Sequence, residues 1–276
     1  MGSGTVLVTG ASTGIGEATA LHLRELGFDA VAGVRRDEDA ERLSGQGLHT
    51  VKLDVTDAAQ IDAARAELGD SELAGLVNNA GIGVGGPIEF FPIELLRRTL
   101  EINLVGQVAV MQAFLPALRR ARGRIVNVSS IGGRIALPLG GPYAASKFGL
   151  EAVSDALRRE LRHLGVDVIV VEPGGVKTPI WQKGVRLAEE AAAAMPPEGE
   201  QLYGRLIETL RVETAKIERE TGMPPRAVAE VIGRALTATR PRTRYMVGRQ
   251  AKVRWALAKR LPDRSMDGLI ARTLRG

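Results

Sequence analysis

Short apolar runs rich in β-branched residues alternate along the chain with longer stretches in which apolar residues recur at helical spacing. Most of the short runs are continuously apolar, as expected of parallel strands covered on both faces. The alternation predicts an α/β fold with a doubly wound parallel sheet of about seven strands and helices on both faces. The predicted strands are Thr5–Thr9, Asp29–Val34, Leu48–Leu53, Leu73–Val77, Gly123–Ser129, Val166–Val171 and Arg244–Val247, and the predicted helices between them are Ile15–Leu26, Asp57–Leu68, Pro92–Arg120 and Tyr143–Leu164.

One segment interrupts this alternation before the last predicted strand. Residues 178–222 contain two helical stretches, Lys183–Ala194 and Glu198–Glu220. Ligands of open α/β sheets bind outside the carboxyl ends of the strands. The segment is short and amphipathic for a separate domain, so we expect a helical lid over a ligand site. The prediction for residues 1–276 is a single domain with this lid and a basic tail at residues 249–276.

The composition excludes several classes of protein. Of the 276 residues, 45% are hydrophobic and 25% are charged, which is typical of a globular chain. The chain contains no cysteine, so it has no disulfide scaffold, thiolate zinc site or cysteine nucleophile. No continuous apolar run reaches the roughly 18 residues of a membrane span. The first predicted strand starts at Thr5, which leaves little room for a signal peptide, and we expect a cytoplasmic protein.

The net charge of +5 is unevenly distributed. Residues 240–276 contain eleven Arg or Lys and two acids, a local net charge of +9. Such a tail suits nucleic acid, an anionic membrane surface or solvent. Only Tyr245 and Trp255 interleave these charges, and no nucleic-acid-binding motif accompanies them. We expect a solvated or partner-facing tail, with weak contact to a membrane surface as the alternative and no nucleic-acid partner.

A glycine-rich turn, Thr9–Gly16 (TGASTGIG), follows the first predicted strand and leads into a helix. Its glycines permit a tight turn and let the backbone approach a pyrophosphate at the helix N-terminus. The alternative is a turn that only caps the helix. Asp54 follows the third predicted strand, and Asn78–Gly81 ends the fourth. Each is compatible with a helix cap alone, but carboxyl ends of parallel strands share one edge of the sheet, so together they predict a ligand crevice there.

Tyr143 and Lys147 stand four residues apart at the start of a predicted helix and therefore share a face. A free tyrosine has a pKa near 10, and a neighbouring ammonium group favours the phenolate and lowers that pKa. Such a phenol can exchange a proton with a hydroxyl group. Ser130 closes a predicted strand upstream, where its hydroxyl can hold a substrate oxygen.

Together these motifs resemble those of the short-chain dehydrogenase/reductase family over nearly the whole chain, to about Val247. The glycine turn is similar to the family's TGxxxGxG element, Asn78–Gly81 to its NNAG element, and Tyr143–Lys147 to its YxxxK element. Asn103 and Ser130 lie forty and thirteen residues before the tyrosine, which matches the family's Asn–Ser–Tyr–Lys set.

The resemblance implies a Rossmann-type fold and a role for each matched residue. Tyr143 exchanges a proton with the carbonyl or alcohol oxygen, and Ser130 hydrogen-bonds that oxygen. Lys147 grips the nicotinamide ribose and depresses the tyrosine pKa. Asn103 holds a water in a proton relay behind the lysine.

The resemblance also implies the main cofactor contacts. Asp54 contacts the adenine amide, Asn79 contacts the ribose side, and Pro173–Thr178 contacts the nicotinamide amide through the Val176 backbone and Thr178. The predicted cofactor-binding residues are Gly10, Ser12, Thr13, Gly14, Ile15, Gly16, Arg35, Arg36, Asp54, Val55, Asn79, Ala80, Gly81, Tyr143, Lys147, Pro173, Gly174, Val176 and Thr178.

Cofactor choice depends on the end of the second predicted strand. NAD sites place an acid there for the ribose 2′-hydroxyl, whereas NADP sites place a cation for the 2′-phosphate. Here Arg35 and Arg36 follow the strand, with no acid before Asp37. A guanidinium matches a phosphate well, so NADP is preferred, NAD is less favoured, and two solvated arginines are the alternative. The three histidines have no ligand spacing, and no metal site is predicted.

The sequence thus predicts an NADP(H)-dependent oxidoreductase that moves hydride between the nicotinamide and an apolar secondary alcohol or ketone. The lid is rich in Leu, Ile, Ala and Met, and Thr243–Gly248 is similar to the steroid- and retinol-dehydrogenase-like branch. The alternatives are an NAD-dependent dehydrogenase, an extended-type epimerase or dehydratase, and a cofactor-binding regulator without turnover. The resemblance implies a homodimer or homotetramer paired through Pro92–Arg120 and Tyr143–Leu164.

Overall fold

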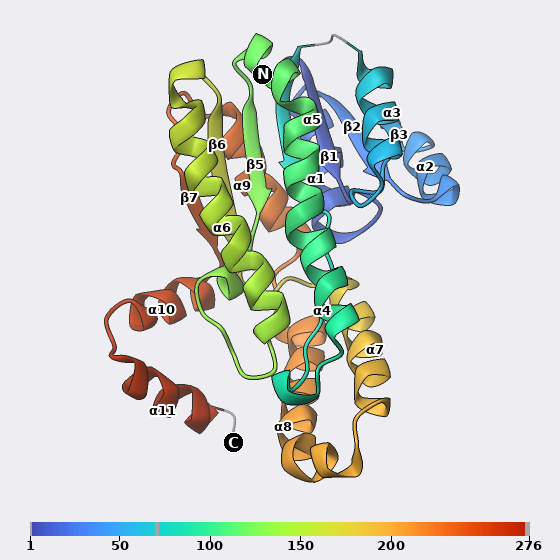
Figure 1. Cartoon of the computed structure of the whole chain (residues 1–276). Helices are drawn as coiled ribbons and strands as arrows, with labels where there is room; N and C mark the ends of the chain where they lie inside the picture. Colours follow the sequence, from blue (N-terminus) through green and yellow to red (C-terminus); the bar gives the residue numbers. More distant parts are fainter. Residues whose placement is uncertain (1, 70–71, 274–276) are drawn as a thin grey trace.

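The computed structural model describes residues 2–69 and 72–273. At its centre is a seven-stranded parallel sheet in the order β3-β2-β1-β4-β5-β6-β7 (Figure 1). This confirms the predicted doubly wound parallel sheet, and the predicted strands differ from the observed ones only at their ends. The strands are β1 Thr5–Thr9, β2 Asp29–Val34, β3 His49–Lys52, β4 Leu73–Asn78, β5 Arg124–Val128, β6 Asp167–Pro173 and β7 Arg244–Val247.

Helices cover both faces of the sheet, α1, α2 and α9 on one face and α3, α5 and α6 on the other. Val6 and Val8 belong to the first core and Leu7 to the second, because successive strand residues point to opposite faces. Both faces are buried, so β1 reads as a continuous apolar run. The helices that cover the sheet are α1 Gly14–Glu25, α2 Asp37–Ser44, α3 Ala58–Leu68, α5 Gly106–Ala121, α6 Gly141–Leu161 and α9 Pro225–Thr237. A further helix, α4 Ile93–Leu100, precedes α5.

The predicted unbroken helix over Pro92–Arg120 is wrong in one respect. A π-helical turn at Glu101–Val105 separates α4 from α5. Such turns insert one residue into the helical ladder and are frequent at functional sites. The turn carries Asn103, whose side chain is fully buried.

The segment Ile93–Ala121 also qualifies the sequence-based statement on membrane spans. Among the described residues it is the one helical stretch long and apolar enough to cross a membrane, by length and composition, although polar residues interrupt it. Val110, Met111, Phe114 and Leu118 of α5 are buried in the core beneath the sheet. About a third of the apolar window, 33%, is buried inside the protein.

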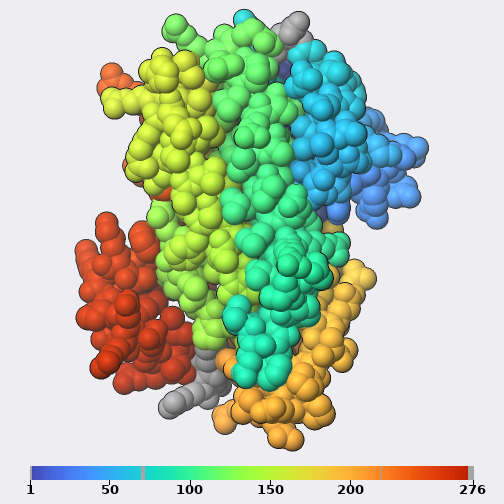
Figure 2. Space-filling view, viewed as in Figure 1, coloured from blue at the N-terminus to red at the C-terminus, as the bar shows by residue number. Residues whose placement is uncertain are grey.

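Two helical pairs project below the carboxyl edge of the sheet, on opposite sides in Figure 1. One consists of α7 (Ile180–Ala193) and α8 (Pro197–Lys216), which form the predicted lid segment. The other consists of α10 (Arg249–Ala258) and α11 (Asp263–Thr273), which form the basic tail. Figure 2 shows both pairs as separate projections from the body. The last three residues of the tail, 274–276, lie outside the described residues.

Candidate active site

The glycine turn has the conformation that its sequence requires. Gly10 and Gly14 have φ angles of 62° and 63°, in the left-handed region that glycine adopts without strain. A Cβ atom on Gly10 would lie 2.7 Å from the Cα of Ala80, and one on Gly16 would lie 2.3 Å from the carbonyl oxygen of Gly10. The turn and the end of β4 therefore pack in direct contact, with no space for larger side chains at these glycines.

The N-terminus of α1 is open toward a ligand. Thr13 is the N-cap residue and makes no capping hydrogen bond with its side chain. A Cβ atom on Gly14 would lie 3.0 Å from Cγ2 of Thr178, so the Pro173–Thr178 loop meets the glycine turn. The free amides of the first helical turn and the positive end of the helix dipole fit a pyrophosphate. These residues therefore fit the phosphate part of a dinucleotide.

Asn79 braces the glycine turn. Its Nδ2 donates to the carbonyl oxygens of Thr9 and Gly10, both at 3.1 Å. The hydroxyl of Thr9 accepts from the backbone N–H groups of Asn79 and Ala80 at 3.0 and 3.1 Å. Both amide protons of Asn79 thus hold the protein backbone, a role in addition to the predicted one on the ribose side.

The structure brings Tyr143 and Ser130 together at the carboxyl ends of the strands. Ser130 begins the turn after β5 and accepts from the N–H of Gly132 at 3.0 Å. A Cβ atom on Gly132 would lie 3.1 Å from Cε1 of Tyr143 and 3.4 Å from Oγ of Ser130. Desolvation raises the pKa of the Tyr143 phenol, and a hydrogen bond with Ser130 opposes that shift. The predicted net lowering of this pKa is therefore not observed, because desolvation is the larger effect.

Lys147 lies one turn beyond Tyr143 on α6 and is buried. Its ammonium group donates to the carbonyl oxygen of Val128 at 2.9 Å and lies 5.8 Å from the centre of the Tyr143 ring. Burial lowers the pKa of Lys147 to about 8, while the carboxylate of Glu151 raises it. Lys147 is therefore a buried amine beside the phenol, and its pKa of about 8 means that it is mostly charged at neutral pH.

Asn103 links the segment after β4 to the start of α6 by hydrogen bonds with Ile82 and Ser146. Its Oδ1 accepts from the N–H of Ile82, and its Nδ2 donates to the carbonyl oxygen of Ile82, both at 2.8 Å. Nδ2 also donates to Ser146 at 3.0 Å. A Cβ atom on Gly81 would lie 3.2 Å from Oδ1 of Asn103 and 3.8 Å from Nζ of Lys147. Asn103 and Lys147 thus both lie against Gly81, and the role of Asn103 in a proton relay stays a prediction.

The two arginines after β2 have different surroundings. Nη1 of Arg35 lies 3.7 Å from the carboxylate of Asp54, and the Arg35 side chain is 62% exposed. Nε of Arg36 donates to Asp39 of α2 at 2.8 Å. Asp54 accepts from the backbone and hydroxyl of Thr56. Arg35 therefore lies exposed beside the predicted adenine contact, whereas Arg36 is held by Asp39 of the helix that follows it.

The remaining predicted residues lie along the same edge. Gly174 donates to the carbonyl oxygen of Val247 at 2.9 Å. Val176 bridges to Met223, and its carbonyl oxygen accepts from the indole of Trp181 at 2.6 Å. The loop that follows β6 is thereby tied to the last strand and to the first turn of α7. Val55 is buried, and Ile15 packs on the core.

Sequence reasoning missed three residues that hold the site. Arg42 of α2 donates to the carbonyl oxygen of Ser12 at 2.6 Å, which brings a guanidinium to the cofactor turn. Gln107 donates to the carbonyl oxygen of Ala80, and Ser146 accepts from Asn103. The fully buried polar character of Gln107 and Ser146 appears only in the fold. The sequence offers no comparable signal for them.

The described residues contain no group of three His, Asp or Glu side chains arranged to hold a metal ion.

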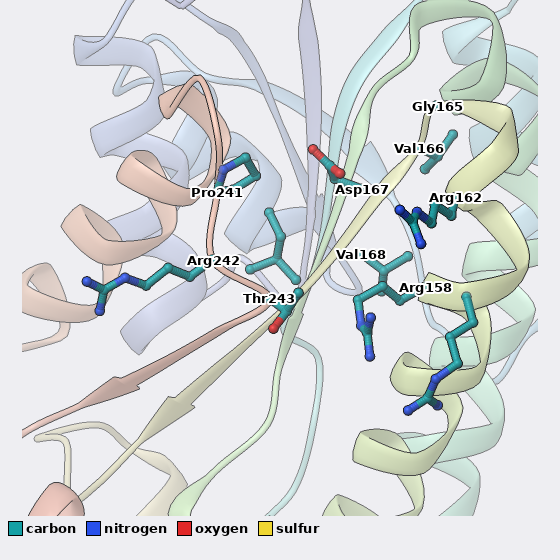
Figure 3. Close-up of a pocket in the computed structure, with 11 residues that line it drawn as sticks. Arg158, Arg162, Gly165, Val166, Asp167, Val168, Pro241, Arg242 and Thr243 are labelled. Atoms are coloured by element: carbon teal, nitrogen blue, oxygen red, sulfur yellow. The ribbon is translucent and has the colours of Figure 1, made fainter.

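A cavity of about 330 Å³ lies away from the candidate site, at the amino ends of β6 and β7 on the opposite edge of the sheet (Figure 3). Arginines of α6 and its C-terminal turn line it together with Asp167 and the loop before β7. No predicted site residue lines this cavity.

Residues 4–187 match the family described as short chain dehydrogenase. The chain is 38% identical to retinol dehydrogenase 5 of Mus musculus over 277 residues, which cover 96% of this chain and 87% of that protein. It is 39% identical to 17-beta-hydroxysteroid dehydrogenase type 6 of Bos taurus over 281 residues, or 97% and 88% of the two chains. It is 35% identical to NADPH-dependent 3-dehydrocapnine reductase of Ornithobacterium rhinotracheale, with 98% and 96% covered.

Among solved structures, a short chain dehydrogenase from Burkholderia cenocepacia in complex with NADP superposes with a TM-score of 0.73 at 27% identity, covering 98% of this chain and 97% of that one. The family match, the sheet order and the glycine turn agree. The chain belongs to the short-chain dehydrogenase/reductase family as an NAD(P)-dependent oxidoreductase, and within that family it is similar to the retinol and steroid dehydrogenases.

Proposed function

We propose that the protein reduces an apolar ketone, or oxidises the corresponding secondary alcohol, with NADP(H) as its cofactor. The observation that carries this proposal is the convergence of Tyr143, Ser130 and Lys147 beside the glycine turn. Ala80 contacts Gly10, and Gly81 lies next to Lys147. A cofactor on the turn would therefore extend its nicotinamide toward the tyrosine.

The proton chemistry follows from the three side chains. The bound nicotinamide supplies or accepts the hydride. Ser130 and Tyr143 hydrogen-bond the substrate oxygen, and Tyr143 donates its proton to that oxygen during reduction. Because desolvation raises the tyrosine pKa, the phenol is protonated at neutral pH, as reduction requires. The ammonium of Lys147 then stabilises the phenolate that remains.

The preference for NADP rests on cations near the end of β2. Arg35 is exposed beside Asp54, and Arg42 reaches the carbonyl oxygen of Ser12 in the turn. Both guanidiniums are within the region where an adenosine 2′-phosphate would bind, and a guanidinium fork suits a phosphate. Arg36 donates to Asp39 at 2.8 Å and Arg42 donates to Glu17 at 2.5 Å. Arg35, which lies 3.7 Å from Asp54, is therefore the main candidate for the phosphate. The NADPH-dependent relative and the NADP-bound neighbour support this choice.

The lid supports an apolar substrate. Trp181 begins α7 next to the loop after β6, and Phe90 packs edge-on against Tyr203 of α8 with their ring centres 6.0 Å apart. The similarity to retinol and steroid dehydrogenases supports the same substrate class. We expect α7 and α8 to contact the apolar part of the substrate from below the strand ends.

The test is NADPH oxidation across a panel of hydrophobic ketones and aldehydes, with pyruvate and a hexose as polar comparisons. We expect turnover on at least one hydrophobic carbonyl compound and none on the polar ones. Turnover with NADH in preference to NADPH would support the NAD-dependent alternative. Tight NADPH binding without turnover on any substrate would instead indicate the regulator.

Assembly, location and tail contact are parts of the same proposal. Val105 and Phe148 are 49% and 43% exposed on the π turn and on α6, which supports a homodimer or homotetramer paired through α5 and α6. Light scattering of the purified protein tests this.

We also propose a cytoplasmic location, with weak contact between the basic tail and an anionic membrane surface. Val253 and Leu257 are exposed among its basic residues, and sedimentation with anionic and neutral vesicles tests the contact.

A further inference from the structure

Four charged side chains from α6, β6, β7 and the turn after β5 form a cluster of ion pairs. This four-charge cluster consists of Arg134, Glu151, Glu172 and Arg244. Arg134 lies 3.3 Å from the Oε2 atom of Glu151 through Nη2, and its Nε donates to the Oε1 atom of Glu172 at 2.6 Å. Arg244 lies 3.2 Å from the same oxygen of Glu151 and 3.6 Å from the same oxygen of Glu172. Each carboxylate is therefore paired with both guanidiniums.

The cluster is costly to place inside the protein. The side chains of Glu151 and Glu172 are only 7% and 3% exposed. Removing a carboxylate from water is unfavourable unless it is well paired, and apolar side chains of similar volume often stabilise such a position as well or better. Stability alone is therefore a poor explanation for the cluster, and what it holds in place is the more informative question.

The two carboxylates of the cluster, Glu151 and Glu172, lie close in the chain to predicted site residues. Glu151 is one helical turn beyond Lys147 on α6. Glu172 directly precedes the Pro173–Thr178 loop, which contacts the glycine turn. Arg244 lies on β7, the strand that this loop also contacts. The cluster thus fixes the lysine turn of α6 relative to the loop after β6.

Arg134 connects the cluster to the serine and to the C-terminal helices. It follows the turn that begins at Ser130. A Cβ atom on Gly133 would lie 2.7 Å from Oγ of Ser129 and 3.2 Å from Cγ of Glu151, so this turn packs tightly against the cluster. On its other side the Arg134 guanidinium lies 5.3 Å from the ring centre of Trp255 in α10, a cation–π distance.

We propose that the four-charge cluster positions the reacting side chains, and that Glu151, one helical turn beyond Lys147 and paired with both arginines, links the cluster to the ammonium group of Lys147. The inference rests on the proposed function, in which that ammonium stabilises the tyrosine phenolate. Burial alone lowers the pKa of Lys147, and the Glu151 charge opposes this. The other ionisable groups around the lysine and the cluster are Tyr143 and Asp155 on α6, Arg134 after the Ser130 turn, Glu172 on β6 and Arg244 on β7.

The direct test titrates Lys147 by NMR. The chain contains seven lysines, so lysine labelled with ¹³C and ¹⁵N gives few side-chain signals, and the buried Lys147 is assigned by its loss in Lys147→Arg. We expect the Lys147 midpoint in Glu151→Gln to fall by about one pH unit, the size of one lost opposite charge. Glu151→Asp, which keeps the charge, should restore most of it.

Asp155→Asn is the matched control. Asp155 also contacts Arg244, at 2.9 Å, but it lies at the outer side of the cluster and is 29% exposed. We expect this variant to keep the parent midpoint for Lys147. It separates the charge of Glu151 from a general weakening of the cluster.

Kinetics provide the second readout. Glu151→Gln should lower kcat roughly tenfold, or about 1.4 kcal/mol of barrier, with little change in KM for NADPH. An unchanged Lys147 midpoint in folded Glu151→Gln would overturn the proposal, as would Glu151→Asp behaving like Glu151→Gln. Absence of turnover in the parent would count against the proposed function, whereas the NMR titration would still decide the role of Glu151.

If Glu151→Gln does not fold, Arg134→Lys decides the question. This variant keeps every charge but loses the planar fork that reaches both carboxylates. We expect kcat to fall severalfold in a variant that circular dichroism shows to be folded. Parent values for both kcat and the Lys147 midpoint would overturn the positioning role.

Discussion

The carboxyl edge of the sheet and the lid below it are built in opposite ways. At the edge, Asn103 and Lys147 are buried, and each makes hydrogen bonds with the backbone. In the lid, no residue of α7 is buried, and Leu202 and Val212 of α8 are 61% and 56% exposed. Buried polar contacts resist small displacements because each one lost leaves an unsatisfied group. The proposed reacting groups therefore lie in a rigid part of the molecule, whereas α7 and α8, the proposed lid, have few buried side chains to hold them in one place.

The largest expected effect breaks the chemistry and leaves the fold intact. Tyr143→Phe removes the hydroxyl that donates the proton, and losing such a group typically costs about 10²–10⁴-fold in rate. Steady-state kinetics on a good ketone substrate measure this loss, and circular dichroism checks the fold. Tyr245→Phe is the control, since it removes a hydroxyl that accepts from the N–H of Arg242 and is not part of the proposed site. Near-parent turnover in Tyr143→Phe would contradict the proposed mechanism.

Next in size is the effect on cofactor choice. Arg35→Asp should weaken NADPH binding roughly 10–100-fold, the range expected for a lost charged hydrogen bond, and NADH binding far less. Arg36→Asp should cost less, because Asp39 already holds that guanidinium. Fluorescence titration with both cofactors measures these affinities. Equal losses for NADPH and NADH in Arg35→Asp would show that Arg35 does not contact the phosphate.

A third experiment asks what the buried charge costs in stability. The pKa of Lys147 is about 8 when folded and near its usual 10.5 when unfolded. The folded state thus binds this proton less tightly, so the cost is full below about pH 8 and disappears as the pH rises through 10.5. We expect inactive Lys147→Met to exceed the parent in free energy of unfolding by about 1–3 kcal/mol at pH 7, because it lacks this charge.

Urea unfolding of both proteins at pH 7 and at pH 10.5 measures that difference. The advantage of Lys147→Met should shrink at the higher pH, where the parent lysine is neutral when folded and only half protonated when unfolded. An advantage that stays constant with pH would assign it to packing instead of charge.

The smallest expected effect concerns the lid. Hydrogen exchange should be fast in α7 and α8 without ligand, because few of their side chains are buried, and slower with NADP and substrate. The β1 and α1 segment around Val6 and Leu23, whose side chains are fully buried, is the internal reference. Equal and strong protection of both regions in the free protein would contradict a moving lid.

Several features of the site could be predicted because their signals are local. The glycines of Thr9–Gly16 are required by backbone conformation at two positions and by close approach at a third. Tyr143 and Lys147 share a helix face through their spacing alone. The strand order and the exact contacts of these residues follow from pairing between distant segments, which no local pattern contains.

Electrostatics separates the two levels most clearly. The spacing of Tyr143 and Lys147 predicts a lowered phenol pKa, yet desolvation in the folded chain raises it. Sequence spacing gives the distance between two charges but not the loss of water around them. Sequence spacing also does not predict that the guanidinium of Arg42 contacts Ser12, 30 residues away in the chain. Nor does it predict the π turn that carries Asn103.

The sequence by itself determined the doubly wound α/β class, the dinucleotide turn and the Ser130, Tyr143 and Lys147 set, because each depends on residue type at short spacing. Tertiary structure alone decided that Glu151 and Glu172 share two arginines, that Arg35 lies beside Asp54 while Arg36 pairs with Asp39, and that Lys147 is a buried cation. These outcomes depend on burial and on contacts between segments far apart in the chain, where the free energy of a charge is set by its surroundings.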